Sequence, residues 1–555
     1  MNPIAKTAPL TGSRKQTLSF SPPPPSGSLA PYQGEWTIQH ASHLLRRTMF
    51  GPDYEQLKWS ASQGLEATLD ELFDESDFPG PPLNSSYGSD PSVGIGETWV
   101  NAPYDGNLVE QMSYRERTLL AWTAGVMIEE GMSIREKLTV FWHNHMPMAA
   151  ILDAKFNFKY IDTFRSQAWG NFRQIIKDMT IDPAMLIYLN GQDNRKTSPN
   201  ENYARELLEL FTIGKGPIAG PGDYTNYTED DIREIARVLS GWRDFGFTTE
   251  SETGEIYSYF KESNHDTGTK TLSHRFNGAQ ISNRGDEEYA HLIDIIFQQE
   301  EVARFICRKL YKWFVFYDIS DEAETKVIQP MADILIDNDY EIKPALQALL
   351  RSEHFYEEEF RGVIIKNPAD FLCSAIKPFK VDISQDLDKK YDSYYRLFGF
   401  IEETQMNFYN IPEVAGWQPY YREPLYYRLW ISASTLPTRM DLTDTLIDGG
   451  LTPFRGNGIR MKIDPLKFIQ MIDDPENPNS VVNEFATILF PKPLTQEQVD
   501  RLKGILIPGL PDFEWTAEYG SYAASPNNSD LANSVKNKLK NLLRAMMSMP
   551  EFYLS

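Results

Sequence analysis

Two histidines, His143 and His145, lie in the segment Phe141-Trp-His-Asn-His, where imidazole side chains could bind a metal ion or transfer a proton. Ser133 and Glu136 have the spacing of a capping box, so the segment is predicted to form a helix. His145 continues the apolar stripe of this helix, whereas His143 lies about 200° away around the helix axis. We therefore expect His145 to be buried, either as a hydrogen-bonded core histidine or as a metal ligand.

A second predicted helix spans residues 200–213 and carries two polar rows. Acidic residues four positions before and after Arg205 form one row, which is typical of an ion ladder on a helix surface. Asn202 and Glu206 form the other row, one step from the apolar face. If this second row lies opposite His145, it offers a carboxylate and an amide to a metal or a substrate. If it faces solvent, it has no such role.

A third set of candidate residues, His265, Asp266 and Lys270, lies in the segment 251–285, which has little helical periodicity. Alternating residues near 255–260 would allow a small β-hairpin there. An imidazole beside a carboxylate can work as acid and base, although in a loop the pattern alone is a weak signal.

The first functional hypothesis is an enzyme, hydrolytic or oxidative, with a pocket between the Phe141 and Asn200 helices. Its residue types suit zinc, iron or manganese, but their spacing matches no established ligand signature, so the cofactor is left as an unidentified divalent metal. The predicted catalytic residues are His145, Glu206, His265, Asp266 and Lys270. The predicted metal ligands are His145, His265 and Glu206, and the supporting residues are His143, Asn202 and Arg205.

The second hypothesis is a non-enzymatic binding or assembly protein that acts with a partner or a glycan at the cell envelope. The chain contains 31 Phe, 28 Tyr and 11 Trp, and many of them cluster in loops such as the one that begins at Trp417. Aromatic side chains in exposed loops are common at interfaces. The same rings could equally pack in the protein's own core.

Helical periodicity over most of the chain predicts an all-α fold, a large multi-helix body with long loops and at most a small β-hairpin. Residues 1–34 are expected to form a flexible arm, because Pro22 to Pro25 favour an extended backbone. Residues 35–375 are predicted to form a helical lobe that carries the polar motifs. Residues 376–555 are predicted to form a C-terminal helical lobe packed on the first.

The net charge of -24 opposes binding to nucleic acid or to an anionic membrane surface. The two cysteines, Cys307 and Cys373, lie in apolar helical segments and predict no disulfide framework. We find no apolar stretch long enough for a signal peptide or a transmembrane span. The expected location is therefore the cytoplasm by default, or a compartment reached by a route that the sequence does not display.

Several segments of the chain match one known family in order and in sequence. They begin at His43, Phe141, Asn200, Tyr227, His265, Ile365, Pro412 and Met549 and span nearly the whole chain. Together they resemble the bacterial domain-of-unknown-function family 1800. The resemblance implies an all-helical fold but no settled activity. Members of that family often resemble exported proteins, and they are commonly encoded beside family 1501, which looks like the sulfatase and alkaline-phosphatase superfamily and is therefore a candidate partner. The oligomeric state is left open.

Overall fold

The computed structural model describes residues 27–76, 78–86 and 89–555, and most of the predicted flexible arm lies outside these ranges. Residues 27–34 of that arm are packed against the body. The N–H of Leu29 donates to the carbonyl of Lys326 (3.3 Å), and the N–H of Tyr32 donates to the carbonyl of Arg351 (2.8 Å). The prediction of flexibility is therefore wrong for residues 27–34, because main-chain hydrogen bonds fix this segment.

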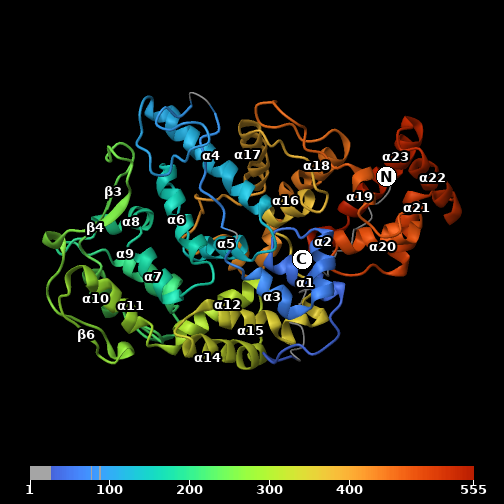
Figure 1. Cartoon of the computed structure of the whole chain (residues 1–555). Helices are drawn as coiled ribbons and strands as arrows, with labels where there is room; N and C mark the ends of the chain where they lie inside the picture. Colours follow the sequence, from blue (N-terminus) through green and yellow to red (C-terminus); the bar gives the residue numbers. More distant parts are fainter. Residues whose placement is uncertain (1–26, 77, 87–88) are drawn as a thin grey trace, which may run out of the picture.

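The fold is built almost entirely from helices, as predicted (Figure 1). Among the described residues, β-structure is limited to three two-stranded antiparallel sheets. The strands are β1 (Ile218–Gly220) with β2 (Asp223–Tyr224), β3 (Trp242–Phe245) with β4 (Tyr257–Phe260), and β5 (Lys270–Thr271) with β6 (Gln280–Ile281). In the same part of the chain, no helix is long and apolar enough to cross a membrane.

In the first half of the body, the described residues form ten α-helices and one π-helical turn. Asp or Asn caps open several of them, as expected where a side chain can accept from the free N–H groups of the first turn. The elements are α1 (Ile38–Thr48), α2 (Tyr54–Gln63), α3 (Leu65–Leu72), α4 (Leu108–Glu129), α5 (Arg135–His145), α6 (Ala154–Ser166), α7 (Phe172–Thr180), α8 (Pro183–Tyr188), α9 (Glu201–Glu206), the π-helix η2 (Leu207–Thr212) and α10 (Glu229–Val238).

The body continues through α11 to α17, and the packing of α17 along α4 is the most extensive contact between two helices. Helices α16 and α17, which flank the predicted lobe boundary at residue 375, also pack against each other. The elements are α11 (Glu288–Ile296), α12 (Glu300–Phe314), α13 (Asp321–Ala323), α14 (Gln329–Asp337), α15 (Ile342–Arg351), α16 (Pro368–Ile376) and α17 (Leu387–Glu403).

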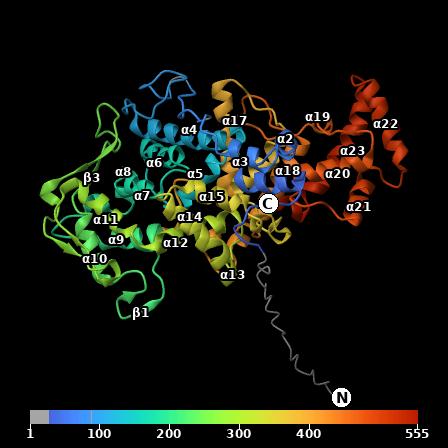
Figure 2. The same cartoon turned by 60° about the horizontal axis from the view of Figure 1, so that its bottom comes forward.

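The last six helices gather at one end of the molecule, drawn in orange to red in Figures 1 and 2. The chain then returns to the centre, where the N–H of Lys366 donates to the carbonyl of Tyr553 (2.8 Å) and Ile365 pairs with Leu554. The helices are α18 (Thr435–Asp448), α19 (Pro465–Ile469), α20 (Pro478–Leu489), α21 (Gln496–Leu506), α22 (Asp512–Ala524) and α23 (Ser529–Met547).

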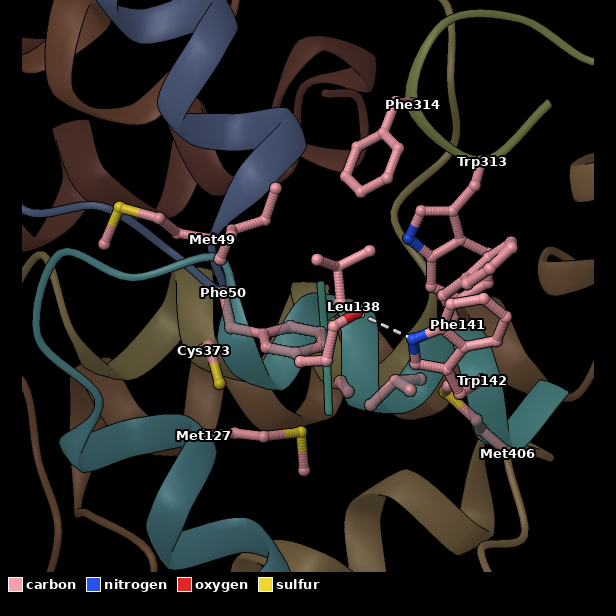
Figure 3. Close-up of a cluster of buried hydrophobic side chains, with 14 of the residues drawn as sticks. Met49, Phe50, Met127, Leu138, Phe141, Trp142, Trp313, Phe314, Cys373 and Met406 are labelled. Atoms are coloured by element: carbon pink, nitrogen blue, oxygen red, sulfur yellow. Dashed lines mark hydrogen bonds between the residues drawn. The ribbon is translucent and has the colours of Figure 1, made fainter. Parts of the chain in front are cut away.

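Helix α5 runs through the hydrophobic core, and all of its residues are buried. Leu138, Phe141 and Trp142 of this helix lie among apolar side chains that come from α4, α12, α16 and the segment directly after α1 (Figure 3). A helix that is enclosed on every side must satisfy each of its polar side chains within the protein. The chemistry available to His143 and His145 therefore depends on the hydrogen-bond partners of their rings.

Candidate functional site

His145 lies in an apolar environment next to the π-helical turn η2. Its Nε2 donates to the carbonyl oxygen of Phe211 (3.0 Å), and its Nδ1 is buried without a hydrogen-bond partner among the described residues. Burial holds the pKa of His145 well below its usual value, and the nearby Lys309 lowers it further. The side chain is therefore a neutral imidazole, and its ring lies against the rings of Phe141 and Phe172.

His143 points to a different neighbour, as its position on the helix predicts. Its Nε2 accepts from the N–H of Tyr409 (3.0 Å), so the ring proton lies on Nδ1, which donates to the hydroxyl of Tyr160 (2.9 Å). Burial lowers the pKa of His143 to about 3. The next residue, Asn144, accepts from the N–H of Trp417 (2.8 Å). These bonds fix the loop 408–417 and give His143 a structural role.

The second polar row does not lie opposite His145. Of the two alternatives that the sequence left open for this row, Asn202 follows the solvent-facing one because it is exposed, and Glu206 is half-buried. Burial raises the pKa of Glu206, and the nearby charge of Glu209 raises it further. Arg205 forms a two-pronged ion pair with Glu229 of α10 (2.9 and 2.7 Å). The reason is that α9 packs mainly on α10, whereas α5 packs mainly on α6.

His265 belongs to a closed network whose central carboxylate is Glu288 of α11. Nδ1 of His265 donates to the carbonyl of Ser240 (2.8 Å), and Nε2 lies 3.2 Å from the carboxylate of Glu288. Lys270 forms an ion pair with the same carboxylate. The side chains of His265, Lys270 and Glu288 are all completely buried. Glu288 is not among the residues predicted from the sequence, and the only local signal for it is its place among the acidic residues at the start of α11.

Asp266 faces away from this network and forms an ion pair with Arg237 (2.7 and 3.2 Å). His265 and Asp266 therefore do not form an acid–base pair. Within the described part of the chain, no three His, Cys, Asp or Glu side chains come together in a way that could hold a metal ion. His145, Glu206 and His265, the predicted metal ligands, each contact separate neighbours.

A cavity of about 380 Å³ lies between α4 and α17, and sequence reasoning did not identify it. Its size is in the range of small-molecule sites, and its wall is mostly apolar. Helix α4 and α17 approach closely because Gly125 lacks a side chain, and a Cβ there would lie 2.7 Å from the ring of Tyr394. Its lining includes Trp122, Glu129, Glu130, Glu136, Tyr391 and Tyr394.

Two carboxyl groups meet at one side of this cavity, where α4 ends and α5 begins. The N–H of Glu136 donates to Oε1 of Glu130 (2.9 Å), while Oε2 of Glu130 is buried and has no partner in the described ranges. Both oxygens of Glu136 accept from Arg165 (2.6 and 2.9 Å). Burial raises the pKa of Glu130 to about 8, and the negative charge of Glu136 contributes. Glu130 is therefore protonated at neutral pH.

Glu129, the preceding residue, is a carboxylate in a different setting. It is exposed and lies 2.5 Å from the ammonium group of Lys390. The protonated Glu130 and the ion-paired Glu129 thus line the same cavity, which is an arrangement that supports acid and base chemistry. In sequence, Glu129 and Glu130 precede Gly131 and read as a polar helix end, so no local pattern distinguishes them.

The second hypothesis predicts that aromatic residues of the loop beginning at Trp417 contact a partner or a glycan. Trp417, Tyr426, Tyr427 and Trp430 are buried, and these rings pack in the protein's own core. Tyr420 also stacks on the ring of Trp313 at a centroid distance of 4.4 Å. This loop therefore gives no support to the binding-protein hypothesis.

Comparison with curated proteins and with solved structures found no match for the chain. A family model matches residues 43–554, which is nearly the whole sequence and includes the predicted motifs as well as the cavity between α4 and α17. The chain therefore belongs to the family described as "Protein of unknown function (DUF1800)".

Proposed function

We propose that the protein is an acid–base enzyme that acts on a ligand bound between α4 and α17. The observation that carries the proposal is Glu130, a carboxyl group with a pKa of about 8 in the wall of a 380 Å³ cavity. A general acid works best when its pKa lies near the working pH. Glu130 is the proton donor, and Glu129, which is ion-paired with Lys390, is the base.

The ligand is a neutral, hydroxylated molecule such as a glycoside. The apolar wall includes the rings of Trp122, Tyr391 and Tyr394, and aromatic rings pack well against the apolar faces of sugars. The charged lining is balanced between carboxylates and the cations Arg135 and Lys390, so it provides no net attraction for an anion. Carboxyl groups at the wall can accept hydrogen bonds from hydroxyl groups.

The test is hydrolysis of a panel of nitrophenyl glycosides by the full-length protein. The release of nitrophenol measures the rate. We expect Glu130→Gln to lower kcat by about 10²–10⁴-fold, as removal of a general acid does. The matched control is Glu110→Gln, which changes an exposed glutamate on the same helix outside the cavity and should leave kcat unchanged.

Two further measurements distinguish acid catalysis from simple binding. The rate should fall as pH rises through about 8, where Glu130 loses its proton. Ligand binding should also change the fluorescence of the wild-type protein, and Trp122→Phe should reduce that change. Equal rates for wild type and Glu130→Gln would refute the catalytic role, and the absence of both turnover and a Trp122 signal across the panel would refute the ligand class.

A further inference from the structure

A second cavity lies among α1, α5, α12 and α16, and its wall carries an excess of positive charge. Its volume is about 30 Å³, and on this measure one water molecule needs about 10–15 Å³. The space is therefore the size of one small ion or about two waters. The charged side chains that line it are Arg46, Arg47, Lys137, Lys312 and Asp370.

The two arginines are held by neutral groups. Nη1 of Arg47 donates to the carbonyls of Phe314 and Val315 (3.3 and 3.0 Å), and its Nη2 donates to the carbonyl of Phe360. Its Nε is buried without a hydrogen-bond partner in the part of the chain that the structure covers. Arg46 donates to main-chain carbonyls and one serine hydroxyl. Carbonyl groups orient a guanidinium group but do not neutralise its charge.

The carboxylate of Asp370 is ion-paired with Lys137, whose ammonium group also lies 4.5 Å from the centre of the Phe50 ring (labelled in Figure 3). The lining therefore carries four positively charged side chains and one carboxylate. Lys312, which is partly exposed, lies at the open side.

Two more buried cations, Lys366 and Arg439, lie close to the charged residues of the cavity. Nζ of Lys366 donates to the carbonyl of Phe552 (2.8 Å), and Nη1 of Arg439 donates to the carbonyl of Lys366 (2.9 Å). Nε and Nη2 of Arg439 are buried and unpartnered among the residues whose positions are described. The segments that begin at His43 and Ile365, both part of the family resemblance, thus contribute to one cluster of cations.

Burial of several like charges is unfavourable unless an opposite charge compensates them. Burial lowers the pKa of Arg47 to about 9 and that of Arg46 to about 10, and it holds the pKa of Lys366 well below its usual value. The positive charge of Arg46 lowers the pKa of Lys366 further. In a chain of net charge -24, such a buried positive cluster is not a consequence of composition.

We propose that this cavity binds a small oxyanion, a phosphate or sulfate group, with Arg47 and Lys137 at its inner wall and Lys312 at its entrance. Guanidinium and ammonium groups bind such oxygens by charge-assisted hydrogen bonds. Arg47 lines the cavity, and its Nε is a buried donor without a partner among the described residues. This cavity is separate from the one between α4 and α17, so the inference is independent of the proposed function.

The test measures the melting temperature of the full-length protein against inorganic phosphate and sulfate, in phosphate-free buffer with chloride at constant ionic strength. We expect a saturable rise that chloride does not reproduce, because an anion that binds the folded state stabilises it. Phenyl phosphate is the second probe. Tighter binding of inorganic phosphate would indicate a free anion, and tighter binding of phenyl phosphate would indicate the anionic group of a larger ligand.

Two lysines of α12 give matched variants, because Lys312 lines the cavity and Lys309, one turn earlier, does not. Lys312→Gln should raise the apparent Kd for phosphate at least threefold, while Lys309→Gln should change it less than twofold. Arg47→Gln should abolish the response. If Arg47→Gln does not fold, the comparison of Lys312→Gln with Lys309→Gln still tests whether the cavity binds the anion. An equal rise with chloride, or the same Kd for both lysine variants, would overturn the inference.

Discussion

His143 and His145 differ in the number of groups that depend on them. The ring of His143 joins the main chain of Tyr409 to the hydroxyl of Tyr160, so two buried polar groups lose a partner if it is removed. His145 makes one hydrogen bond, to the carbonyl of Phe211. A buried polar group without a partner costs about 1–3 kcal/mol. Replacement of the two histidines should therefore lower the free energy of unfolding by different amounts.

We expect His143→Leu to lower the free energy of unfolding by roughly 2–4 kcal/mol and His145→Leu by roughly 1–2 kcal/mol. Urea unfolding followed by circular dichroism measures both. Each variant serves as the control for the other, because the two positions lie on one buried helix and receive the same side chain. A larger loss for His145→Leu would contradict the hydrogen-bond pattern of the structure.

Glu130 makes stability depend on pH in a defined direction. Its folded pKa of about 8 exceeds the usual value of 4.5, so the folded state keeps a proton that the unfolded state has lost. The stabilisation is complete below pH 4.5 and is lost as pH rises to about 8. Glu130→Gln should therefore gain stability relative to wild type over this interval, by roughly 1–3 kcal/mol. Melting curves at pH 5 and pH 8.5 measure this, and a pH-independent difference would contradict it.

At the scale of elements, the pairing of α4 with α17 creates the cavity of the proposed enzyme. Gly125 on α4 touches the ring of Tyr394, whereas Gly399 on α17 has open space where a Cβ would stand. Both glycines lie within helices, so replacement by alanine has the same intrinsic benefit at both positions. The difference in the free energy of unfolding between the two alanine variants therefore measures how closely α4 and α17 pack.

Gly125→Ala should lower the free energy of unfolding by roughly 1–3 kcal/mol, because the new Cβ would force Tyr394 or the helix to move. Gly399→Ala should raise it by roughly 0.5–1 kcal/mol. Thermal unfolding of the two single variants gives the comparison. Stabilisation by both substitutions would mean that α4 and α17 are not in close contact at Gly125.

At the scale of the whole molecule, burial keeps most histidines neutral. The pKa is lowered for five of the eight, primarily by burial, and the five are His40, His43, His143, His145 and His354. These side chains bind protons near pH 6.5 only in the unfolded state. Two buried carboxyl groups act in the opposite direction, with pKa values of about 8 for Glu130 and about 6 for Asp182.

Stability should therefore fall as pH decreases from 6.5 to 5, because the unfolded chain takes up as many as three more protons than the folded protein. The upper limit of the effect is about 4 kcal/mol per pH unit. Melting temperatures at pH 7.5, 6.5 and 5.5 in buffers of equal ionic strength measure it. A melting temperature that is constant or higher at pH 5.5 would show that the histidines are not buried in neutral form.

The sequence alone determined the helical class, the core position of His145 and the divergent directions of His143 and His145. These properties follow from the spacing of residues along one segment, which sets the face of a helix on which each side chain lies. Tertiary structure decided the rest. It separated His145, Glu206 and His265, because α5 and α9 pack mainly on other helices. It also raised the pKa of Glu130 and brought Arg47, Lys137 and Asp370 to one cavity. Burial and charge at these sites depend on segments far apart in the chain, and no local pattern encodes them.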